Sequence, residues 1–273
     1  MSSLVQRLLT AIVLIPIVAW VVLLSPETVY ISVLSIIILT AGYEWSALCD
    51  VQNKFKKYSV AIVTLVIAYL LTRLNEQALL TLMSASLIFW LSVTIFIISK
   101  PQWLLIVKMK QWLMLGLGLI VLSIAFLSLY LIRVNFSQGP DLLMYLLLLI
   151  WVADSGAYFV GRAIGRRKLS PVISPGKSIE GVVGGLIACL LFSFLGVNYF
   201  NIENSPIFIL VSIFVAFISV YGDLFESLMK RRANVKDSGS ILPGHGGILD
   251  RIDSLIAAGP VFVACALLTQ VFQ

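Results

Sequence analysis

Two aspartates near the carboxyl end of the chain are the residues best suited to chemistry. Asp250 and Asp253 are three positions apart, so on a helix their carboxylates project from one face. A third carboxylate, Asp223, lies in an apolar stretch just before a cluster of Lys and Arg. Carboxylate oxygens together with substrate phosphates are the ligands that Mg²⁺ prefers. The three residues predict a Mg²⁺ site, although Asp250 and Asp253 are also compatible with acids that simply favour a first helical turn.

A glycine-rich turn directly precedes these two aspartates. Its backbone N–H groups can bind an anion, and it stands ahead of a helix N-terminus that also favours anions; its members are Pro243, Gly244, His245, Gly246 and Gly247. The same polar stretch carries a group of cations: Lys230, Arg231, Arg232 and Lys236. Lys binds a phosphate through the compact charge of its ammonium group, and Arg binds it through the several N–H donors of its planar guanidinium group. The combination predicts binding of metal-bound phosphate, while we interpret Arg232 as a membrane-side anchor only.

A second polar stretch, GRAIGRRKLSPVISPGKSIEG, lies between two long apolar segments. Its Lys177 and Ser178 stand at a predicted helix N-terminus, where they can hold a phosphate of the lipid or of a nucleotide. The G-x-x-x-x-G-K-[ST] spacing of a Walker A loop is absent from this stretch. Two glycine pairs match G-x-x-x-G, which we interpret as close helix packing: Gly161 with Gly165 and Gly181 with Gly185.

Five carboxylates lie within or at the ends of apolar stretches, where an ionisable group costs about 2.5–3.5 kcal/mol on insertion scales. They are Glu44, Asp154, Glu180, Asp223 and Glu226. Glu44 and Glu226 lie near the ends of their stretches, and contact with water or a neighbouring Lys explains them at least as well as catalysis does. Asp154 lies mid-span, which suits a structural hydrogen bond as well as a functional role. The roles of Asp154, Glu180 and Asp237 stay open between support of the site and direct contact.

Membrane-spanning helices must position these residues, because the composition excludes a soluble domain. Of 273 residues, 60% are hydrophobic and 12% are charged, with a mean hydropathy of +1.04, whereas soluble domains are nearer half apolar and a quarter charged. Continuous apolar runs also exclude an alternating β-barrel. Nine runs approach the roughly 20 residues that a helix needs to cross a bilayer: Leu8–Leu24, Val29–Leu48, Tyr58–Thr72, Ala78–Ile98, Leu113–Val134, Leu142–Ile164, Ile179–Phe200, Pro206–Glu226 and Ser254–Phe272. The shorter patch Trp103–Val107 is expected at the membrane interface.

The cations predict the orientation of these spans. With nine alternating spans, 17 of the 19 Lys and Arg residues fall on one side, and only Arg73 and Arg133 fall on the other. By the positive-inside rule, the N-terminus and the two long loops, 162–178 and 227–253, face the cytoplasm. No small-residue cleavage site follows the first apolar run, so we expect that helix to be retained. The chemistry is expected in the two long loops.

Cysteine and histidine usage excludes several kinds of site. Cys49, Cys189 and Cys265 are widely separated in or beside apolar stretches, so we interpret them as packing residues rather than zinc ligands or disulfide partners. A single histidine, His245, excludes a centre built from several histidines, but one His can still act on a substrate.

The stretch Ser227–Asp253 resembles the signature of the phosphatidate cytidylyltransferase family, also called CDP-diacylglycerol synthases. The matching positions are Ser227, Lys230-Arg231, Lys236-Asp237, Gly239, Leu242-Pro243, His245-Gly246-Gly247 and Asp250-Arg251-x-Asp253. Upstream positions are also similar to the family: Asp154, Tyr158, Gly161-Arg162, Ser174-Pro175, Lys177 and Glu180-Gly181, with Ser178 where Thr is common. The resemblance covers roughly residues 150–257, and over the first 140 residues it is one of hydropathy alone.

The resemblance implies the reaction CTP + phosphatidate → CDP-diacylglycerol + diphosphate, in a multi-span dimer with an aspartate-built metal centre at the cytoplasmic side. Carried over by motif, the metal ligands are Asp223, Asp250 and Asp253, with Mg²⁺ and a second, monovalent cation such as K⁺. The residues expected to take part in catalysis with them are Lys230, Arg231, Lys236 and His245. Those expected to bind substrate are Lys177, Ser178, Ser227, Asp237, Gly246, Gly247 and Arg251. CTP, phosphatidate and a second copy of the chain are the expected partners, and no nucleic acid is expected.

The predicted fold is an all-α polytopic integral membrane protein of about nine transmembrane helices, with the active site at the cytoplasmic side. Residues 1–140 are expected to serve as scaffold, lipid entry or dimer contact, and residues 141–273 to form the catalytic region. A bacterial-type inner or plasma membrane is the expected location. Two alternatives stay open, a CTP-dependent kinase of a polyprenol or phytol and, less favoured because the acids and glycines gather at one face, a membrane transporter.

Overall fold

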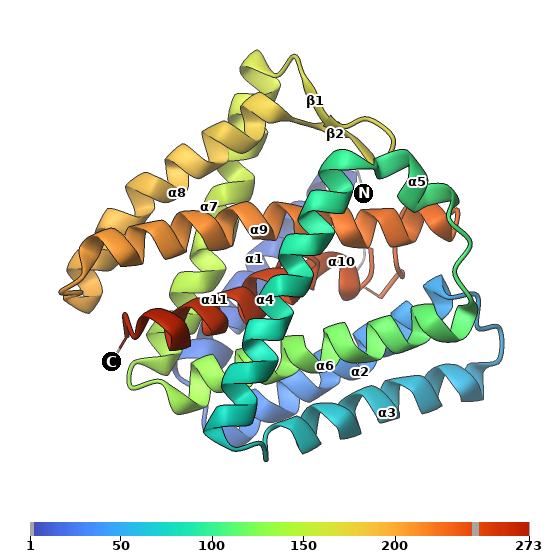
Figure 1. Ribbon diagram of the computed structural model, residues 1–273, viewed down its shortest axis with the longest axis horizontal. Coiled ribbons are helices and arrows are strands. Elements are labelled where there is room, and N and C mark those ends of the chain that lie inside the picture. Colours follow the sequence, from blue (N-terminus) through green and yellow to red (C-terminus); the bar gives the residue numbers. More distant parts are fainter. Residues whose placement is uncertain (1–2, 242–245, 273) are drawn as a thin grey trace. The chain divides into compact units, whose positions relative to one another are not determined.

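The computed structural model describes residues 3–241 and 246–272, with side chains from residue 12 onward. Over these residues the chain is almost entirely helical (Figure 1). The long helices are α1 (Ser3–Leu23), α2 (Glu27–Leu48), α3 (Lys54–Leu71), α4 (Glu76–Ser99), α6 (Gln111–Asn135), α7 (Gly139–Ile164), α8 (Ile179–Phe200), α9 (Ser205–Arg232) and α11 (Leu255–Thr269). Between them lie the short helices α5 (Pro101–Ile106) and α10 (Leu249–Ile252) and the strands β1 (Lys168–Ser170) and β2 (Ser174–Ser178).

The helices confirm the all-α polytopic fold class. Among the described residues, seven helical segments are long and apolar enough to cross a membrane: α2, α4, α6, α7, α8, α9 and α10 with α11. The remaining two predicted spans correspond to α1, whose part from Ile12 to Leu23 is a shorter apolar helix, and to the 18-residue α3. The number of nine spans therefore stays a prediction. The patch at Trp103–Val107 corresponds to α5, which is much too short to cross.

Helix boundaries follow local cap chemistry. Asn53 and Asn75 begin α3 and α4, and each side chain accepts a hydrogen bond from a backbone N–H in the first turn. Asn201 ends α8 in the left-handed region, at φ 51°, where Asn is tolerated better than most residues. The apolar runs fix which segments are helical, and these polar residues fix where the helices start and stop.

The two stretches predicted to be long loops are more ordered than expected. α9 continues through Lys230 and Arg231 to Arg232, because Lys and Arg are good helix formers and their charge is favourable at a helix C-terminus. In the other stretch, α7 ends at Ile164, where the apolar run was predicted to end, and an antiparallel hairpin of β1 and β2 follows. The three-residue and five-residue strands are too short to give a periodic pattern in the sequence.

The chain forms two compact units, each assembled from separate segments. The first comprises residues 1–74, 107–144 and 229–256, and the second comprises residues 75–106, 145–228 and 257–273. The division predicted near residue 140 is one of function, and the fold does not test it.

In the first unit, α2, α3 and α6 pack against one another (Figure 1). Trp45 of α2 lies directly over Gly118 of α6, where a Cβ atom would overlap the indole ring, and its Nε1 donates to Met114 O at 2.9 Å. Cys49, just beyond α2, is buried, and this burial raises the pKa of its thiol to about 12. The other two cysteines are buried as well, as expected of packing residues.

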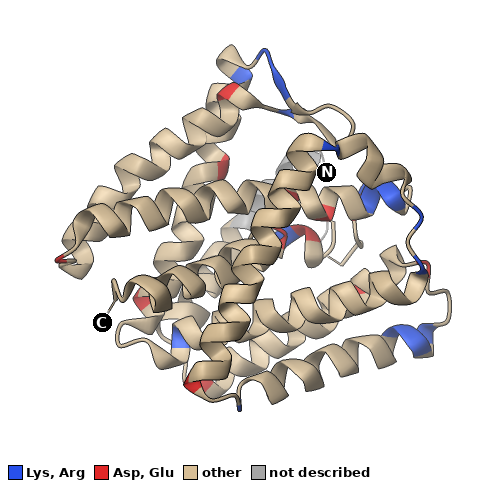
Figure 2. Ribbon diagram, in the orientation of Figure 1, with Lys and Arg blue, Asp and Glu red and all other residues tan. Residues whose placement is uncertain are grey.

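Basic residues are segregated within this unit. Three lysines lie in the first turn of α3 and Lys110 immediately precedes α6, whereas Arg73 and Arg133 lie at the other ends of these helices (Figure 2). Arg133 donates to Val22 O at 2.7 Å and to Ser25 O at 3.1 Å, so it connects the end of α6 to the last turn of α1 and to the segment that follows it. This separation agrees with the predicted sidedness, and the orientation in a membrane stays a prediction.

In the second unit, α7 and α8 approach closely through small residues. A Cβ at Gly185 would lie 2.6 Å from Ala153 O, and one at Gly181 would lie 2.8 Å from Ala157 O. These contacts support the interpretation of the Gly181/Gly185 pair as a packing motif. Elsewhere in this unit Trp90 of α4 packs edge-on against Phe225 of α9, with ring centroids 5.4 Å apart.

Candidate active site

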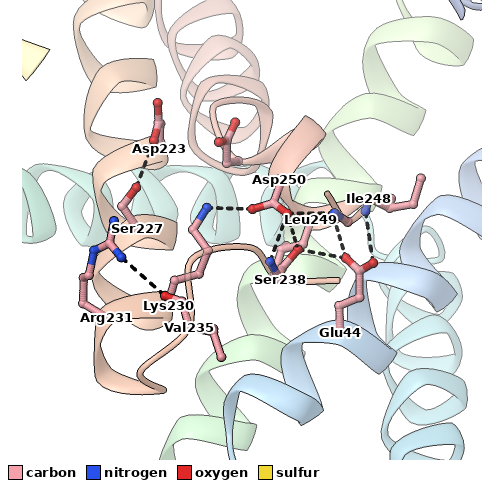
Figure 3. Close-up of polar contacts among 12 residues, drawn as sticks. Glu44, Asp223, Ser227, Lys230, Arg231, Val235, Ser238, Ile248, Leu249 and Asp250 are labelled. Atoms are coloured by element: carbon pink, nitrogen blue, oxygen red, sulfur yellow. Dashed lines mark hydrogen bonds and ion pairs between the residues drawn. The ribbon is translucent and has the colours of Figure 1, made fainter. Parts of the chain in front are cut away.

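A lysine–aspartate pair joins the end of α9 to α10. Lys230 Nζ donates to Asp250 Oδ1 at 2.6 Å (Figure 3). The two side chains are only 12% and 5% exposed, so solvent screens their attraction weakly. Both residues were predicted to act on metal-bound phosphate, and the structure brings them into direct contact.

The other carboxylate oxygen of Asp250 holds the loop that precedes α10. Oδ2 accepts from the backbone N–H and the hydroxyl of Ser238, both at 3.0 Å, and from the N–H of Gly247 at 2.8 Å. Within the described residues this carboxylate therefore accepts four hydrogen bonds, three at Oδ2 and one at Oδ1, so a lone pair of Oδ1 is left for a cation. Gly246 has φ +81°, and a Cβ there would lie 2.6 Å from Asp250 Oδ2, so the turn requires glycine.

A second lysine–aspartate pair joins the hairpin to α9. Lys177 Nζ of β2 lies 2.6 Å from Asp223 Oδ2, and each side chain is 25% exposed. Ser227, one turn further along α9, donates to Asp223 Oδ1 at 3.3 Å (Figure 3). This carboxylate has fewer donors than that of Asp250 and is more open to solvent. The sequence predicted Lys177 and Asp223 for different ligands, and the structure pairs them with each other.

The residues at the start of α8 have local structural roles. Ser178 is the N-cap, its Oγ accepts from Gly181 N at 3.1 Å, and the residue is 7% exposed. Glu180 accepts from the backbone N–H groups of Arg166 at 3.0 Å and Arg167 at 3.1 Å. Glu180 thus supports the chain just before the hairpin, and substrate contact by Ser178 stays a prediction.

The remaining charged residues of the two polar stretches differ in exposure. Arg232 donates to Val107 O at 2.7 Å, and its role as a membrane-side anchor stays a prediction. Asp253, which is half-buried, accepts from Ser254 N at 2.7 Å. The following residues predicted to act on substrate are exposed: Arg231, Lys236, Asp237 and Arg251. His245 lies outside the described residues, as do Pro243 and Gly244, so the role of His245 stays a prediction.

Glu44, near the end of α2, contacts the loop that precedes Asp250, which the sequence did not predict. Glu44 is 3% exposed. Its carboxylate accepts hydrogen bonds from Ser238 Oγ at 3.1 Å, Ile248 N at 3.1 Å and Leu249 N at 2.8 Å (Figure 3). Of the two alternatives left open for Glu44, contact with water or a Lys does not agree with these contacts, and a role in catalysis stays a prediction. Glu226, for which the same was expected, is fully buried.

The three aspartates predicted to hold Mg²⁺ are divided between the two compact units, Asp223 in one and Asp250 with Asp253 in the other. Among the residues that the structure describes, no group of three or more His, Cys, Asp or Glu side chains is gathered as a metal site. The donor chemistry nevertheless fits a hard cation, because Asp223 and Asp250 each already hold an ammonium group at 2.6 Å. The three-aspartate metal site stays a prediction.

The apolar helices define a polytopic membrane protein, and the lysine–aspartate pairs beside glycine turns are its candidate active site. The sequence model described as the cytidylyltransferase family matches residues 5–269. The chain therefore belongs to the cytidylyltransferase family, whose members are nucleotidyltransferases.

Curated relatives resemble the chain over nearly its whole length. Phosphatidate cytidylyltransferase of Pseudomonas aeruginosa is 37% identical over 265 residues, which cover 95% of this chain and 95% of that protein. The protein of the same name from Haemophilus influenzae is 36% identical over 282 residues, covering 94% and 96% respectively. That of Staphylococcus aureus is 47% identical over 127 residues, 46% of this chain and 48% of that protein. The similarity thus includes the first 140 residues, where the signature motifs are absent.

Proposed function

We propose that this chain is a phosphatidate cytidylyltransferase of a bacterial plasma membrane, which converts CTP and phosphatidate into CDP-diacylglycerol and diphosphate. The observation that carries the proposal is the similarity over 95% of both chains to a relative of that name. The lysines and aspartates of the matched signature, paired within each compact unit, support it.

The chemistry needs little proton transfer from the protein. A phosphate monoester has its second pKa near 6, so the phosphate of phosphatidate is largely dianionic at neutral pH and its oxygen can attack unaided. The new bond forms between that oxygen and the α-phosphorus of CTP, and the bond from the α-phosphorus to the bridging oxygen breaks as diphosphate leaves. This accounts for a chain with one histidine that relies on cations and carboxylates.

The main barrier is electrostatic, because an anionic lipid must approach an anionic triphosphate. The residues we assign to the phosphates are Lys177 of β2 and the exposed cations Arg231, Lys236 and Arg251. Lys177 is bound to a carboxylate that is itself partly exposed, so an incoming phosphate can exchange for that partner. Gly246 and Gly247 contribute backbone to the turn that we assign to the nucleotide phosphates or to diphosphate.

Asp223, Asp250 and Asp253 are the residues we assign to Mg²⁺, with a second monovalent cation such as K⁺ as a further expectation. When bound, Mg²⁺ would neutralise charge on the reacting phosphates and favour departure of diphosphate. Asp223 and Ser227 share one face of α9 with Lys230, since positions i, i+4 and i+7 of a helix align. A single helix therefore carries a predicted metal ligand and the lysine that orients Asp250.

The membrane context suits the two substrates. Phosphatidate keeps its acyl chains in the bilayer while its headgroup reaches the site, and water-soluble CTP arrives from the cytoplasm, the side to which the positive-inside rule assigns the loops. The homodimer implied by the family resemblance belongs to the proposal as well, and the mass of the purified protein in detergent by light scattering checks it.

Labelled CTP tests the reaction directly. We expect label at the α-phosphate to enter the lipid when phosphatidate is the acceptor, and label at the γ-phosphate to leave as diphosphate. Transfer of γ label to a polyprenol or phytol, with no α label in lipid, would show a lipid kinase instead. Omission of phosphatidate is the control, and it should abolish incorporation.

A further inference from the structure

A membrane helix outside the signature motifs reaches into the loop that carries Asp250. Glu44 belongs to α2, about 200 positions before that loop, yet its carboxylate accepts hydrogen bonds from Ser238, Ile248 and Leu249. Two of the three donors are backbone N–H groups at the start of α10, and Ile248 and Leu249 immediately precede Asp250. The buried carboxylate of Glu44 thus binds the two residues that directly precede the predicted metal ligand Asp250.

Glu44 and Asp250 hold the same segment from two sides. The Ser238 hydroxyl lies 3.1 Å from Glu44 Oε2 and 3.0 Å from Asp250 Oδ2, so its one proton is shared between two carboxylates. Glu44 also receives two backbone N–H groups, and Asp250 receives two backbone N–H groups and the ammonium of Lys230. Removal of either carboxylate would leave buried donors without an acceptor, which costs more than a hydrogen bond is worth.

Two glycines of the loop leave room for the Glu44 carboxylate. A Cβ added at Gly239 would overlap Glu44, and its three nearest atoms all belong to that side chain. A Cβ at Gly247 would overlap both Ser238 Oγ and the Glu44 carboxylate. The loop backbone therefore closes around Glu44 at two points, and glycine at these points is explained by a side chain of α2.

α2 is itself fixed within its unit. Trp45, the next residue, is 1% exposed and is bonded through Nε1 to Met114 O of α6. Gln111 Nε2 at the start of α6 donates to Cys49 O at 2.9 Å, just beyond α2. The end of α2 is thus fixed to α6 at two points that follow Glu44, so its carboxylate is a fixed point for the loop.

We propose that Glu44 is a positioning residue of the active site, which sets the conformation of residues 246–250 and so the direction of the Asp250 carboxylate. The proposal rests on the role of Asp250 in the proposed function. It gives α2 a specific task in catalysis beyond those of scaffold, lipid entry or dimer contact. A carboxylate is required because three donors converge on it, whereas an amide has one oxygen and adds two donors of its own.

The first test compares Glu44→Gln with Ser46→Ala in the full-length protein in detergent. Ser46 is a matched control, because it is also buried on α2 and its hydroxyl donates only to Tyr43 O of its own helix, at 2.7 Å. We expect Glu44→Gln to lower kcat by about 10²-fold, the cost of a misplacement near 1 Å. We also expect amide hydrogen exchange at Ile248 and Leu249 to accelerate at least about tenfold. Exchange in the peptides of α2 and α6 should stay as in the unmodified protein, and Ser46→Ala should change neither quantity.

The second test uses the space around Gly239. Gly239→Ala alone should lower kcat, because its Cβ meets the Glu44 side chain. Glu44→Asp withdraws the carboxylate by one methylene, so the double variant Glu44→Asp with Gly239→Ala should be more active than Gly239→Ala alone. Such compensation measures a direct interaction between the two positions, which general destabilisation would not produce.

The outcomes separate this proposal from the proposed function. Unchanged exchange at residues 247–249 in Glu44→Gln would overturn the positioning role whatever the activity. Acceleration spread equally over α2 and α6 would also overturn it, since Glu44 would then only stabilise the fold. If Glu44→Gln does not purify, a double variant no more active than Gly239→Ala is the overturning result. Because exchange is measured without substrate, it decides the role of Glu44 even if phosphatidate proves to be the wrong acceptor.

Discussion

The two lysine–aspartate pairs share a distance of 2.6 Å but differ in their surroundings. Lys230 and Asp250 are 12% and 5% exposed, and Asp250 accepts three further hydrogen bonds from the described residues. Lys177 and Asp223 are each 25% exposed, and Asp223 has only the Ser227 hydroxyl as a further donor there. The same two residue types therefore form an enclosed pair in one compact unit and an open pair in the other.

This difference in exposure indicates which pair holds the conformation of the loop and which pair can exchange its partner for a substrate ion. A weakly screened ion pair with several further hydrogen bonds keeps its partners, because breaking it leaves an uncompensated charge away from water. A pair in contact with solvent gains less from its attraction and can release either partner to another ion. We infer that the Asp250 pair sets the form of the loop, while the Asp223 pair is the one in which Lys177 can exchange its carboxylate for a phosphate.

Asp250→Asn should have the largest effect, because it breaks the enclosed pair. The substitution replaces the buried carboxylate that accepts from Lys230 by an amide and brings an NH₂ group toward existing donors, so we expect destabilisation of about 3 kcal/mol and loss of turnover by at least about 10³-fold. Thermal melting in detergent and the labelled-CTP assay measure the two effects. Asp50→Asn is the control, since Asp50 is exposed and its left-handed backbone suits Asn equally well. Stability unchanged in Asp250→Asn would show that the pair does not hold the loop.

Asp223→Asn should lose activity while it keeps its stability. The pair with Lys177 is partly open, so its loss should cost about 0–1 kcal/mol, but the predicted cation site loses a charged ligand and turnover should fall by about 10²–10³-fold. The contrast with Asp250→Asn lies in the ratio of the two effects, measured in the same assays. Near-normal turnover at saturating Mg²⁺ would contradict the metal assignment of Asp223. Asp253→Asn should resemble Asp223→Asn in activity.

The helices were largely predictable because the bilayer restricts what can cross it. A spanning segment must satisfy its backbone internally, so continuous apolar runs had to be helices, and Ile179–Phe200 was predicted with the same bounds as α8. The helical turn after Glu226 was missed, because charged residues ended the apolar pattern without ending the helix. The end of an apolar run predicts where a helix leaves the lipid, whereas the helix propensity of the following residues decides where the helix itself ends.

The candidate residues were predictable by type, and their partners were not. Asp223, Asp250 and Lys177 were recognisable as acids and cations beside glycine turns, but their pairings join residues 20 and 46 positions apart. The contacts of Glu44 lie still further along the chain, at separations of 194 to 205 positions. Such pairings arise from tertiary packing, and no local pattern encodes them. The one available signal for Glu44 was the cost of a carboxylate in an apolar stretch, which indicates that a partner exists without naming it.

Lys177→Gln should have the smallest of these effects, and it tests whether the Lys177–Asp223 pair contributes to stability or only to substrate binding. The substitution removes a cation that we assign to a phosphate, so we expect the KM for one substrate to rise by about tenfold, equivalent to the loss of one charged hydrogen bond, with melting unchanged. Lys168→Gln is a matched control on the same hairpin, because Lys168 is exposed in β1. Lys177→Arg should keep part of the affinity, since it preserves the charge but changes its geometry. If Lys177→Gln instead lowered the melting temperature as much as Asp250→Asn, the pair with Asp223 would be structural and the distinction between enclosed and open pairs would fail.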